Sequence, residues 1–245
     1  MITKKSNSSL SYDFFSGESI LFDKALNRTS FQVVYDVRKI TKVKKVGHAG
    51  TLDPKASGLL IVCTGRKTKK ISSFQELGKT YTGSFILGKT TPSMDSETEP
   101  DSEKPFSHIS EEHLDEARMT FIGEIEQIPP MYSAVNYGGK KLYKLARKGK
   151  VVKRKPRKIQ IYEFQITKVD LPEIFFKIVC SKGTYIRVIA HDFGEKLGCG
   201  AYLGSLRRTH IGDFSVADAF SMDEFRKFYG DLNLIEPSPK VLFET

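Results

Sequence analysis

The stretch GHAGTLDPKASGLLIVCTGRKTK, residues 47–69, decides how this chain is interpreted. Its opening twelve residues hold three glycines, a histidine, an aspartate and a proline, which are typical of a shaped loop. The apolar run LLIVCTG at 59–65 follows at once and has the length of a buried strand. Pro54 restricts Asp53 to extended conformations and can therefore aim its carboxylate. The stretch thus leaves two roles open for Asp53: it only shapes a turn, or it takes part in catalysis.

For an isolated Leu-Asp-Pro, a turn in which the aspartate caps its own backbone is the ordinary interpretation. A phosphate-binding loop is a second possibility. The stretch matches neither G-x-x-x-x-G-K-[ST] nor G-x-G-x-x-G, and an aspartate among phosphates would be repulsive without a metal ion. The local pattern by itself therefore favours the turn.

The composition is that of an ordinary globular chain. Its 245 residues, of which 39% are hydrophobic and 28% charged, suffice for one large domain or two small ones. No apolar run has the length of a membrane span, and the start lacks the apolar core of a signal peptide. Cys63, Cys180 and Cys199 are widely spaced, without metal-ligand spacing, and we expect free thiols in a cytoplasmic protein without membrane partners.

The charge is basic and unevenly distributed. Lys and Arg number 39 against 29 Asp and Glu, which gives a formal net charge of +10. Residues 140–158 include eleven Lys or Arg and no acid, whereas residues 93–116 include nine acids. A basic segment of this density suits a polyanion such as nucleic acid, because each neutralised phosphate releases counterions. A solvated loop that only keeps the chain soluble is the alternative.

Strand and helix patterns mix without strict alternation, which indicates an α+β fold with a largely antiparallel sheet. The patterns predict strands at Ser19–Phe22, Leu59–Gly65, 81–88, 159–169 and 173–180, the last two forming a hairpin. They predict helices over Thr29–Lys42, Glu111–Phe121, Tyr185–Leu197 and Ser221–Tyr229. In the first helix we expect a common stripe of Phe31, Val34, Tyr35 and Arg38. Thr184 is the expected cap of the third.

The stretch 47–69 resembles, almost residue for residue, the signature of the TruB family of tRNA pseudouridine synthases. Three further blocks resemble that family in its order: KTYTGSFILGKTTPSMD (79–95), QIPPMYSAVNYGGKKLYKLARKG (127–149) and CSKGTYIRVIAHDFGEKLGCGAYLGSLRRTHIGDF (180–214). The resemblance covers residues 24 to 214. It implies the pseudouridine synthase fold, with a largely antiparallel mixed central sheet flanked by helices and loops, and an RNA-binding cleft across it. It also implies that residues 1–245 form a single catalytic domain.

The family's essential aspartate corresponds to Asp53. The resemblance therefore favours a catalytic role for Asp53 over a turn. Pseudouridylation breaks the N1–C1′ bond of uridine and rejoins the uracil through C5, so it requires neither a cofactor nor a metal. A carboxylate near the ribose and base is required, and attack on the uracil and action at the ribose both remain open. Arg187 matches the family arginine that pairs with this carboxylate, and Tyr81 the tyrosine that stacks on the target base.

Further matches imply contacts to RNA. His48 resembles the residue that helps to hold the loop open as the target nucleotide is flipped out, and Tyr185 would form a second aromatic wall of the pocket. Lys24, Lys69 and Leu206 match other pocket positions. A basic insertion over about 127–158 would bind RNA phosphates. Its candidate residues are Lys140, Lys141 and Arg147.

The family's usual substrate is uridine 55 in the T loop of tRNA, and we expect a stand-alone bacterial type of enzyme, monomeric and without a protein partner. Three departures occur: Lys24-Ala25 where Lys-Pro is common, SETEP (96–100) after Asp95, and about thirty residues after Phe214, too few for a C-terminal PUA domain. Alternatives are a guide-RNA-dependent enzyme acting on ribosomal RNA, a non-catalytic tRNA chaperone, and an aspartate-nucleophile hydrolase.

Overall fold

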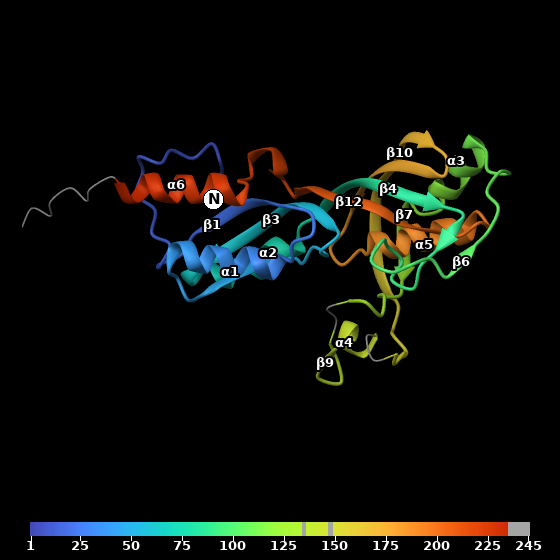
Figure 1. The fold of residues 1–245 in the computed structure, drawn as a ribbon, viewed down its shortest axis with the longest axis horizontal. Helices are drawn as coiled ribbons and strands as arrows, with labels where there is room; N and C mark the ends of the chain where they lie inside the picture. The colour runs from blue at the N-terminus through green and yellow to red at the C-terminus, as the bar shows by residue number, and fades with distance from the viewer. Residues whose placement is uncertain (134–135, 147–148, 235–245) are drawn as a thin grey trace, which may run out of the picture. The chain divides into compact units, whose positions relative to one another are not determined.

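The computed structural model describes residues 1–133, 136–146 and 149–234, and the chain groups into two compact units (Figure 1). Unit 1 comprises Met1–Gln75 and the chain from Phe214 onward, and unit 2 comprises Glu76–Asp213. The α+β class with a mostly antiparallel sheet is confirmed. That the whole chain acts as one catalytic domain with an RNA-binding cleft stays a prediction.

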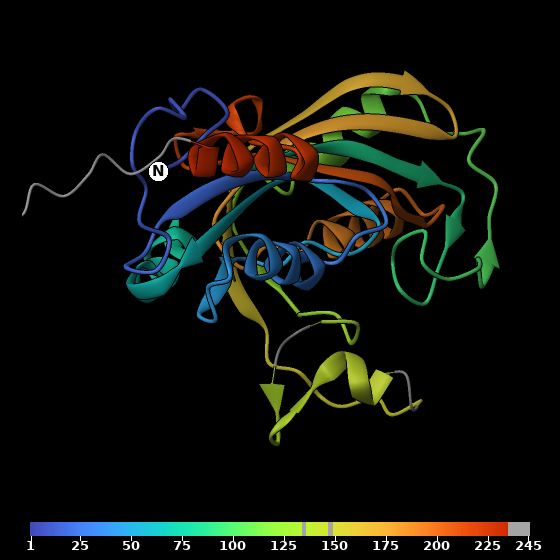
Figure 2. The same cartoon turned by 60° about the vertical axis from the view of Figure 1, so that its left-hand side comes forward.

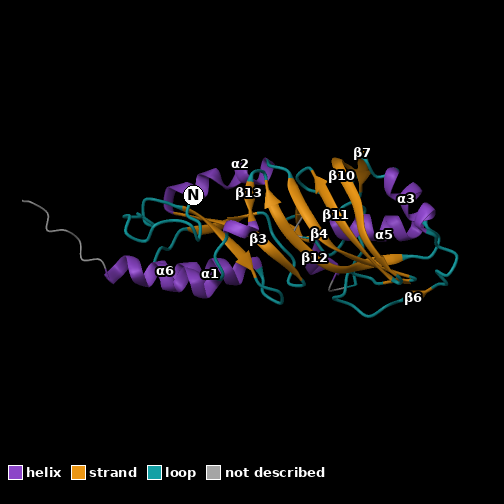
Figure 3. Cartoon of the chain, turned by 90° about the horizontal axis from the view of Figure 1, so that it is seen from above, coloured by secondary structure: helices purple, strands orange, loops and turns teal. Residues whose placement is uncertain are grey.

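Unit 1 is a small sheet covered by two helices. Strand β3 (Ala56–Thr64) pairs antiparallel with β1 (Ser19–Lys24) and with β2 (Val46–Ala49). Helices α1 (Ser30–Thr41) and α6 (Met222–Leu234) pack on the same apolar core (Figure 3). Shorter elements complete the unit: η1 (Gly65–Lys70), β13 (Phe214–Ser215), η2 (Val216–Asp218) and all but the last residue of α2 (Ile71–Glu76).

The prediction of helix α1 is confirmed, but the predicted stripe is wrong. Thr29 and Gln32 form a capping box, and Lys42 ends the helix in the left-handed region at φ 59°. Phe31 and Tyr35 are 62% and 57% exposed. The residues buried instead are Ser30, Val33, Val34, Val37 and Thr41. Because α1 carries apolar residues on two faces, only packing against the sheet selects the valine face.

Unit 2 is built on a five-stranded antiparallel sheet of order β12-β4-β11-β10-β7. Five phenylalanine rings in mutual contact fill the core between this sheet and α3 and α5: Phe85, Phe121, Phe164, Phe176 and Phe193. The strands are β12 (Ala201–Ile211), β4 (Lys79–Leu87), β11 (Glu173–Cys180), β10 (Arg157–Asp170) and β7 (Gly123–Gln127). The helices are α3 (Glu111–Met119) and α5 (Ile186–Lys196).

Two small ribbons extend unit 2. Strand β5 (Lys89–Thr90) pairs with β6 (Ser102–Glu103), and β8 (Asn136–Tyr137) pairs with β9 (Lys140–Lys141), which precedes α4 (Leu142–Ala146). Figure 2 shows that the segment with β8, β9 and α4 projects from the sheet of unit 2. Within the predicted insertion, this part of the chain therefore stands away from the core.

Most of the other element predictions are confirmed. β10 and β11 form the expected hairpin, Ser110 caps α3, and Ser221 exchanges hydrogen bonds with Glu224 at the start of α6. The predicted cap of α5 is wrong, because Tyr185 occupies the N-cap position while the Thr184 hydroxyl donates to the carbonyl oxygen of Ser181. Strand β12 was not predicted, since AYLGSLRRTHI lacks a clean alternation of apolar and polar residues.

The three cysteines are free and buried, as the sequence predicted for Cys63, Cys180 and Cys199. Burial raises the pKa of the Cys180 thiol to about 11. In the part of the chain that the structure describes, no helix has the length and apolar character needed to cross a membrane.

Candidate active site

The loop that carries Asp53 joins β2 to β3 in unit 1 and is anchored on both sides of the aspartate. The Ser30 hydroxyl donates to the carbonyl oxygen of Leu52 (3.1 Å) and accepts from the Leu52 amide (2.9 Å). On the other side, the Asn27 amide donates to the carbonyl oxygen of Pro54 at 2.8 Å. Ser30 is only 2% exposed, so these hydrogen bonds are shielded from water. Asp53 is half-buried, and its two neighbours Leu52 and Pro54 are the residues held by Ser30 and Asn27.

Three other predicted RNA-binding residues lie in unit 1. His48 is half-buried on β2, opposite Val62 of β3. Lys69 is exposed in η1. Lys24 is 1% exposed, and its ammonium donates to the carbonyl oxygens of Ala25 (3.0 Å) and Arg28 (2.6 Å). Lys24 therefore holds together the turn between β1 and α1, a structural task that the sequence analysis did not assign to it.

Tyr81 lies on β4, between β12 and β11 of the unit 2 sheet. It is 9% exposed on β4 and stands opposite Ile178 of β11 and Arg208 of β12. Lys79, two residues earlier on the same strand, is 7% exposed, and burial followed by the Arg208 charge lowers its pKa to about 8. Lys79 and Arg208 are therefore two buried basic residues at strand positions close to Tyr81. Leu206 is half-buried on β12, opposite Gly83.

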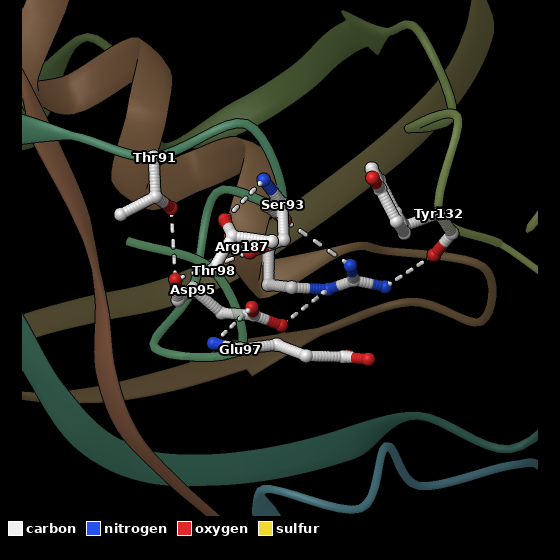
Figure 4. A network of polar contacts seen from close by, with 7 residues as sticks. All are labelled: Thr91, Ser93, Asp95, Glu97, Thr98, Tyr132 and Arg187. Carbon is white, nitrogen blue, oxygen red and sulfur yellow. Dashed lines mark hydrogen bonds and ion pairs between the residues drawn. The ribbon is translucent and has the colours of Figure 1, made fainter. Parts of the chain in front are cut away.

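Arg187 is the centre of a polar network in unit 2 (Figure 4). It lies on α5, and its Nε is 3.6 Å from Oδ2 of Asp95, both side chains being 5% exposed. Its Nη2 donates to the carbonyl oxygen of Tyr132 (2.8 Å) and its Nη1 to that of Ser93 (3.3 Å). The guanidinium thus ties the 91–98 loop and the Tyr132 segment to α5. Because buried charge is costly unless neutralised and hydrogen-bonded, this set of partners explains how Arg187 tolerates burial.

The Asp95 loop is itself held in shape by short-range hydrogen bonds. The hydroxyl groups of Thr91 (2.8 Å) and Ser93 (3.2 Å) donate to the backbone carbonyl of Asp95, and the Glu97 amide donates to its carboxylate at 2.9 Å. Ser93 and Thr98 hydroxyl groups are 2.8 Å apart (Figure 4). These hydrogen bonds within the loop therefore fix the Asp95 carboxylate independently of its ion pair with Arg187.

The backbone of Tyr185 is clamped by the side-chain amide of Gln127, the last residue of β7. Oε1 of Gln127 accepts from the Tyr185 amide (2.8 Å), and Nε2 donates to the Tyr185 carbonyl oxygen (3.1 Å). Gln127 is 3% exposed. Tyr185 is the N-cap of α5 and has no side-chain cap of its own, so Gln127 fixes the start of the helix that carries Arg187.

The basic insertion is only partly described. Lys140 and Lys141 form β9, while Arg147 falls outside the described residues. Further along, Lys150, Lys153 and Lys155 are exposed. The Arg154 guanidinium donates to the carbonyl oxygens of Pro129 (3.1 Å) and Val152 (3.0 Å) and so supports the local backbone.

The predicted site residues fall in both units: Asp53 and His48 belong to unit 1, and Tyr81, Tyr185, Arg187 and Leu206 belong to unit 2. The ion pair between Asp53 and Arg187 stays a prediction. Sequence reasoning missed Asp95, Gln127 and Ser30. Asp95 and Gln127 lie in blocks already quoted for their resemblance, but no local pattern links either of them to α5. Among the described residues, no group of three or more His, Cys, Asp or Glu could hold a metal ion.

Two family models match this chain. The model of the N-terminal domain of TruB family pseudouridylate synthases matches residues 38–186. The model of the tRNA pseudouridylate synthase B C-terminal domain matches residues 187–234. Together these matches run without a gap from α1 to α6 and include Asp53, Tyr81 and Arg187.

Curated relatives are similar over most of their length. The tRNA pseudouridine synthase B of Flavobacterium johnsoniae is 47% identical over 222 residues, which is 88% of this chain and 97% of that protein. That of Chlorobaculum tepidum is 51% identical over 212 residues, covering 84% and 88%.

Among solved structures, a chain of a Cbf5-Nop10-Gar1 complex is 26% identical with a TM-score of 0.69, covering 89% of this chain and 60% of that one. A chain of an H/ACA RNP bound to a substrate RNA containing 2′-deoxyuridine is 24% identical with a TM-score of 0.68 and supports the fold assignment alone. This chain covers 57% of that second structure's length.

Proposed function

The chain belongs to the TruB family of pseudouridine synthases, and from this premise we propose that it isomerises uridine 55 in the T loop of tRNA to pseudouridine. The observation that carries the proposal is the family match across residues 38–234, supported by relatives named tRNA pseudouridine synthase B at 47–51% identity. The position within tRNA rests on the resemblance of the four sequence blocks.

Asp53 is the proposed catalytic carboxylate. The reaction breaks the N1–C1′ bond, turns the uracil and forms a C5–C1′ bond, after which the C5 proton is removed and N1 ends protonated. Substrate and product are isomers, so the reaction itself consumes no oxidant or co-reactant. A carboxylate can attack the uracil ring or act at the ribose. A loop anchored by Ser30 and Asn27 would hold the carboxylate in place for either route.

Tyr81 and Arg187 complete the proposed catalytic set. Arg187 would neutralise the Asp53 carboxylate and keep it ionised in a site from which water is excluded. Since Arg187 is also tied to Asp95 and two carbonyl oxygens, its orientation would be fixed before substrate arrives. Tyr81 would stack on the target base and move a proton late in the reaction.

The target base must leave its stack before it can react, at a cost of roughly a few kcal/mol. We propose that His48 holds the RNA loop open as the nucleotide flips out, that Tyr185 forms an aromatic wall of the pocket, and that Lys69 and Leu206 also line it. Lysines and arginines of the basic insertion, including Lys140, Lys141 and Arg147, would bind the phosphates of the T arm. No protein partner is required in this proposal, and the chain acts as a monomer in the cytoplasm.

The test uses unmodified tRNA transcript and the purified chain without added cofactor. Pseudouridine is mapped by carbodiimide-dependent reverse-transcription stops, with Asp53→Asn as the matched variant. We expect a single stop at position 55 that is absent with the variant, while tRNA binding is retained. Binding without any stop would instead favour a chaperone or a guide-dependent enzyme, and substantial product formation by Asp53→Asn would overturn the role of Asp53.

A further inference from the structure

Helix α1 leaves two aromatic rings in solvent. Phe31 is 62% exposed and Tyr35, one turn later, is 57% exposed. The core of unit 1 is filled by the opposite face of the helix, through Val33, Val34 and Val37. Two large rings at i and i+4 spacing form a continuous apolar surface. The packing of unit 1 makes no use of this surface, so it is available to another molecule.

One cation lies near the Phe31 ring, and two more follow at the end of the same helix. The Arg38 guanidinium carbon is 5.9 Å from the centroid of the Phe31 ring, and its Nη2 donates to the carbonyl oxygen of Val46 at 2.9 Å. Lys39 and Lys42 are exposed on the following turn. We call Phe31, Tyr35, Arg38, Lys39 and Lys42 the outer face of α1.

The net charge of this part of unit 1 is strongly positive. Residues 28–45 hold six Lys or Arg and a single acid, Asp36, whose Oδ2 already lies 2.5 Å from a guanidinium nitrogen of Arg28. The amide of Gly65 donates to the carbonyl oxygen of Lys45, which joins the exposed basic residues of η1 to the same segment. The surface around the rings therefore attracts a polyanion.

Unpaired RNA fits both properties of this face. Aromatic side chains stack on unstacked bases, and neighbouring lysines bind the phosphates on either side. The face also begins next to the candidate catalytic loop, because Phe31 directly follows Ser30, whose hydroxyl is hydrogen-bonded to Leu52. An RNA held by the Asp53 loop could reach the outer face of α1 within the same unit.

We propose that the outer face of α1 is an additional RNA-binding surface. Phe31 and Tyr35 stack on unpaired bases of the substrate tRNA, and Lys39 and Lys42 bind the adjacent phosphates. This inference rests on the proposed function, since it takes the same RNA as its ligand. It assigns to α1 a share of tRNA affinity that the pocket residues and the basic insertion do not supply.

The absence of tryptophan from the sequence gives a direct probe. Phe31→Trp introduces a single indole on the outer face of α1, and Tyr162→Trp introduces one at a site on β10 that is 59% exposed. Titration with unmodified tRNA transcript should quench the indole fluorescence of Phe31→Trp at least twice as strongly as that of Tyr162→Trp. Equal quenching of the two variants would overturn the proposal.

Affinity measurements separate stacking from charge. We expect Phe31→Ala/Tyr35→Ala to weaken tRNA binding at least tenfold with an unchanged salt slope, and Lys39→Gln/Lys42→Gln to reduce that slope by about 1.5. Unchanged affinity in the aromatic pair would overturn the inference. Pseudouridine formation by the wild-type protein is measured alongside. If tRNA is modified but Phe31→Trp shows no stronger quenching than Tyr162→Trp, this inference alone is overturned. If Phe31→Trp is quenched but no pseudouridine forms, the proposed function is overturned and RNA binding at α1 stands.

Discussion

The guanidinium of Arg187 lies 3.6 Å from the carboxylate of Asp95, and both side chains are 5% exposed. Residues 92 positions apart in the chain thus share a buried ion pair that no local pattern signals. The family resemblance implied that Arg187 pairs with Asp53. Asp95 gives the arginine a carboxylate partner within unit 2, which fixes it independently of Asp53.

We expect Asp95→Asn to destabilise the protein and to slow catalysis. The substitution keeps the shape and removes the charge that neutralises Arg187, and breaking a buried ion pair costs about 3 kcal/mol. Turnover of tRNA should fall at least tenfold because the arginine loses its orientation. Denaturant unfolding and single-turnover kinetics measure the two effects. Asp101→Asn, which removes the charge of an exposed residue of the neighbouring segment, is the control and should leave both unchanged.

Gln127→Leu should lower kcat about tenfold while leaving KM for tRNA within a factor of two. The amide clamps the Tyr185 backbone at the start of α5, so its loss loosens Tyr185 and Arg187 without removing a contact to phosphate. Gln127→Glu keeps the acceptor for the Tyr185 amide but cannot donate to its carbonyl oxygen, and an intermediate kcat is expected. Equal kcat values for Gln127→Leu and wild type would contradict this role.

Ser30→Ala should loosen the candidate catalytic loop that carries Asp53. Two hydrogen bonds to Leu52 are lost, for which about 2 kcal/mol of unfolding free energy is expected. Hydrogen exchange at the amides of residues 50–56 should rise, and kcat should fall. The exposed Ser73→Ala serves as the control. Unchanged exchange in the loop would show that Asn27 and the flanking strands suffice to hold it.

Neutralising Lys150, Lys153 and Lys155 to Gln should weaken tRNA binding and flatten its salt dependence. Each phosphate contact contributes roughly 0.7–0.9 to the slope of log K against log salt, so the slope should fall by about 2. Lys168→Gln, which removes a lysine already bonded to Asp170, is the control. An unchanged slope in the triple variant would indicate that this segment is a solvated loop that makes no phosphate contacts.

Stability should rise with pH between about 8 and 10.5, the ordinary value of a lysine, because of Lys79. Burial lowers its pKa to about 8 in the folded protein, so the unfolded chain binds more protons in this window. Raising the pH then removes the penalty of a buried ammonium group, and lowering it towards 8 restores that penalty. Lys79→Met should abolish this part of the pH dependence in chemical denaturation. A Lys79→Met protein with the wild-type profile would show that another group titrates there.

The order of residues was enough to predict the α+β class, the family and the candidate catalytic residues. Local signals were enough for this, since Thr29, Ser110 and Ser221 cap helices through residues three positions away. The blocks quoted for their resemblance contain Asp53, Tyr81 and Arg187, whose catalytic roles stay predictions.

The contacts that hold those residues in place, and the surfaces that stay exposed, became visible only in the folded chain. The contacts of Ser30 to Leu52, Gln127 to Tyr185 and Arg187 to Asp95 join segments 22 to 92 residues apart, and such pairs have no spacing that a periodic pattern can record. The lack of a local signal for packing also explains why the stripe predicted for α1 was wrong. Its apolar residues occupy two faces of one helix, and packing against the sheet buried the valines and left Phe31 and Tyr35 in solvent.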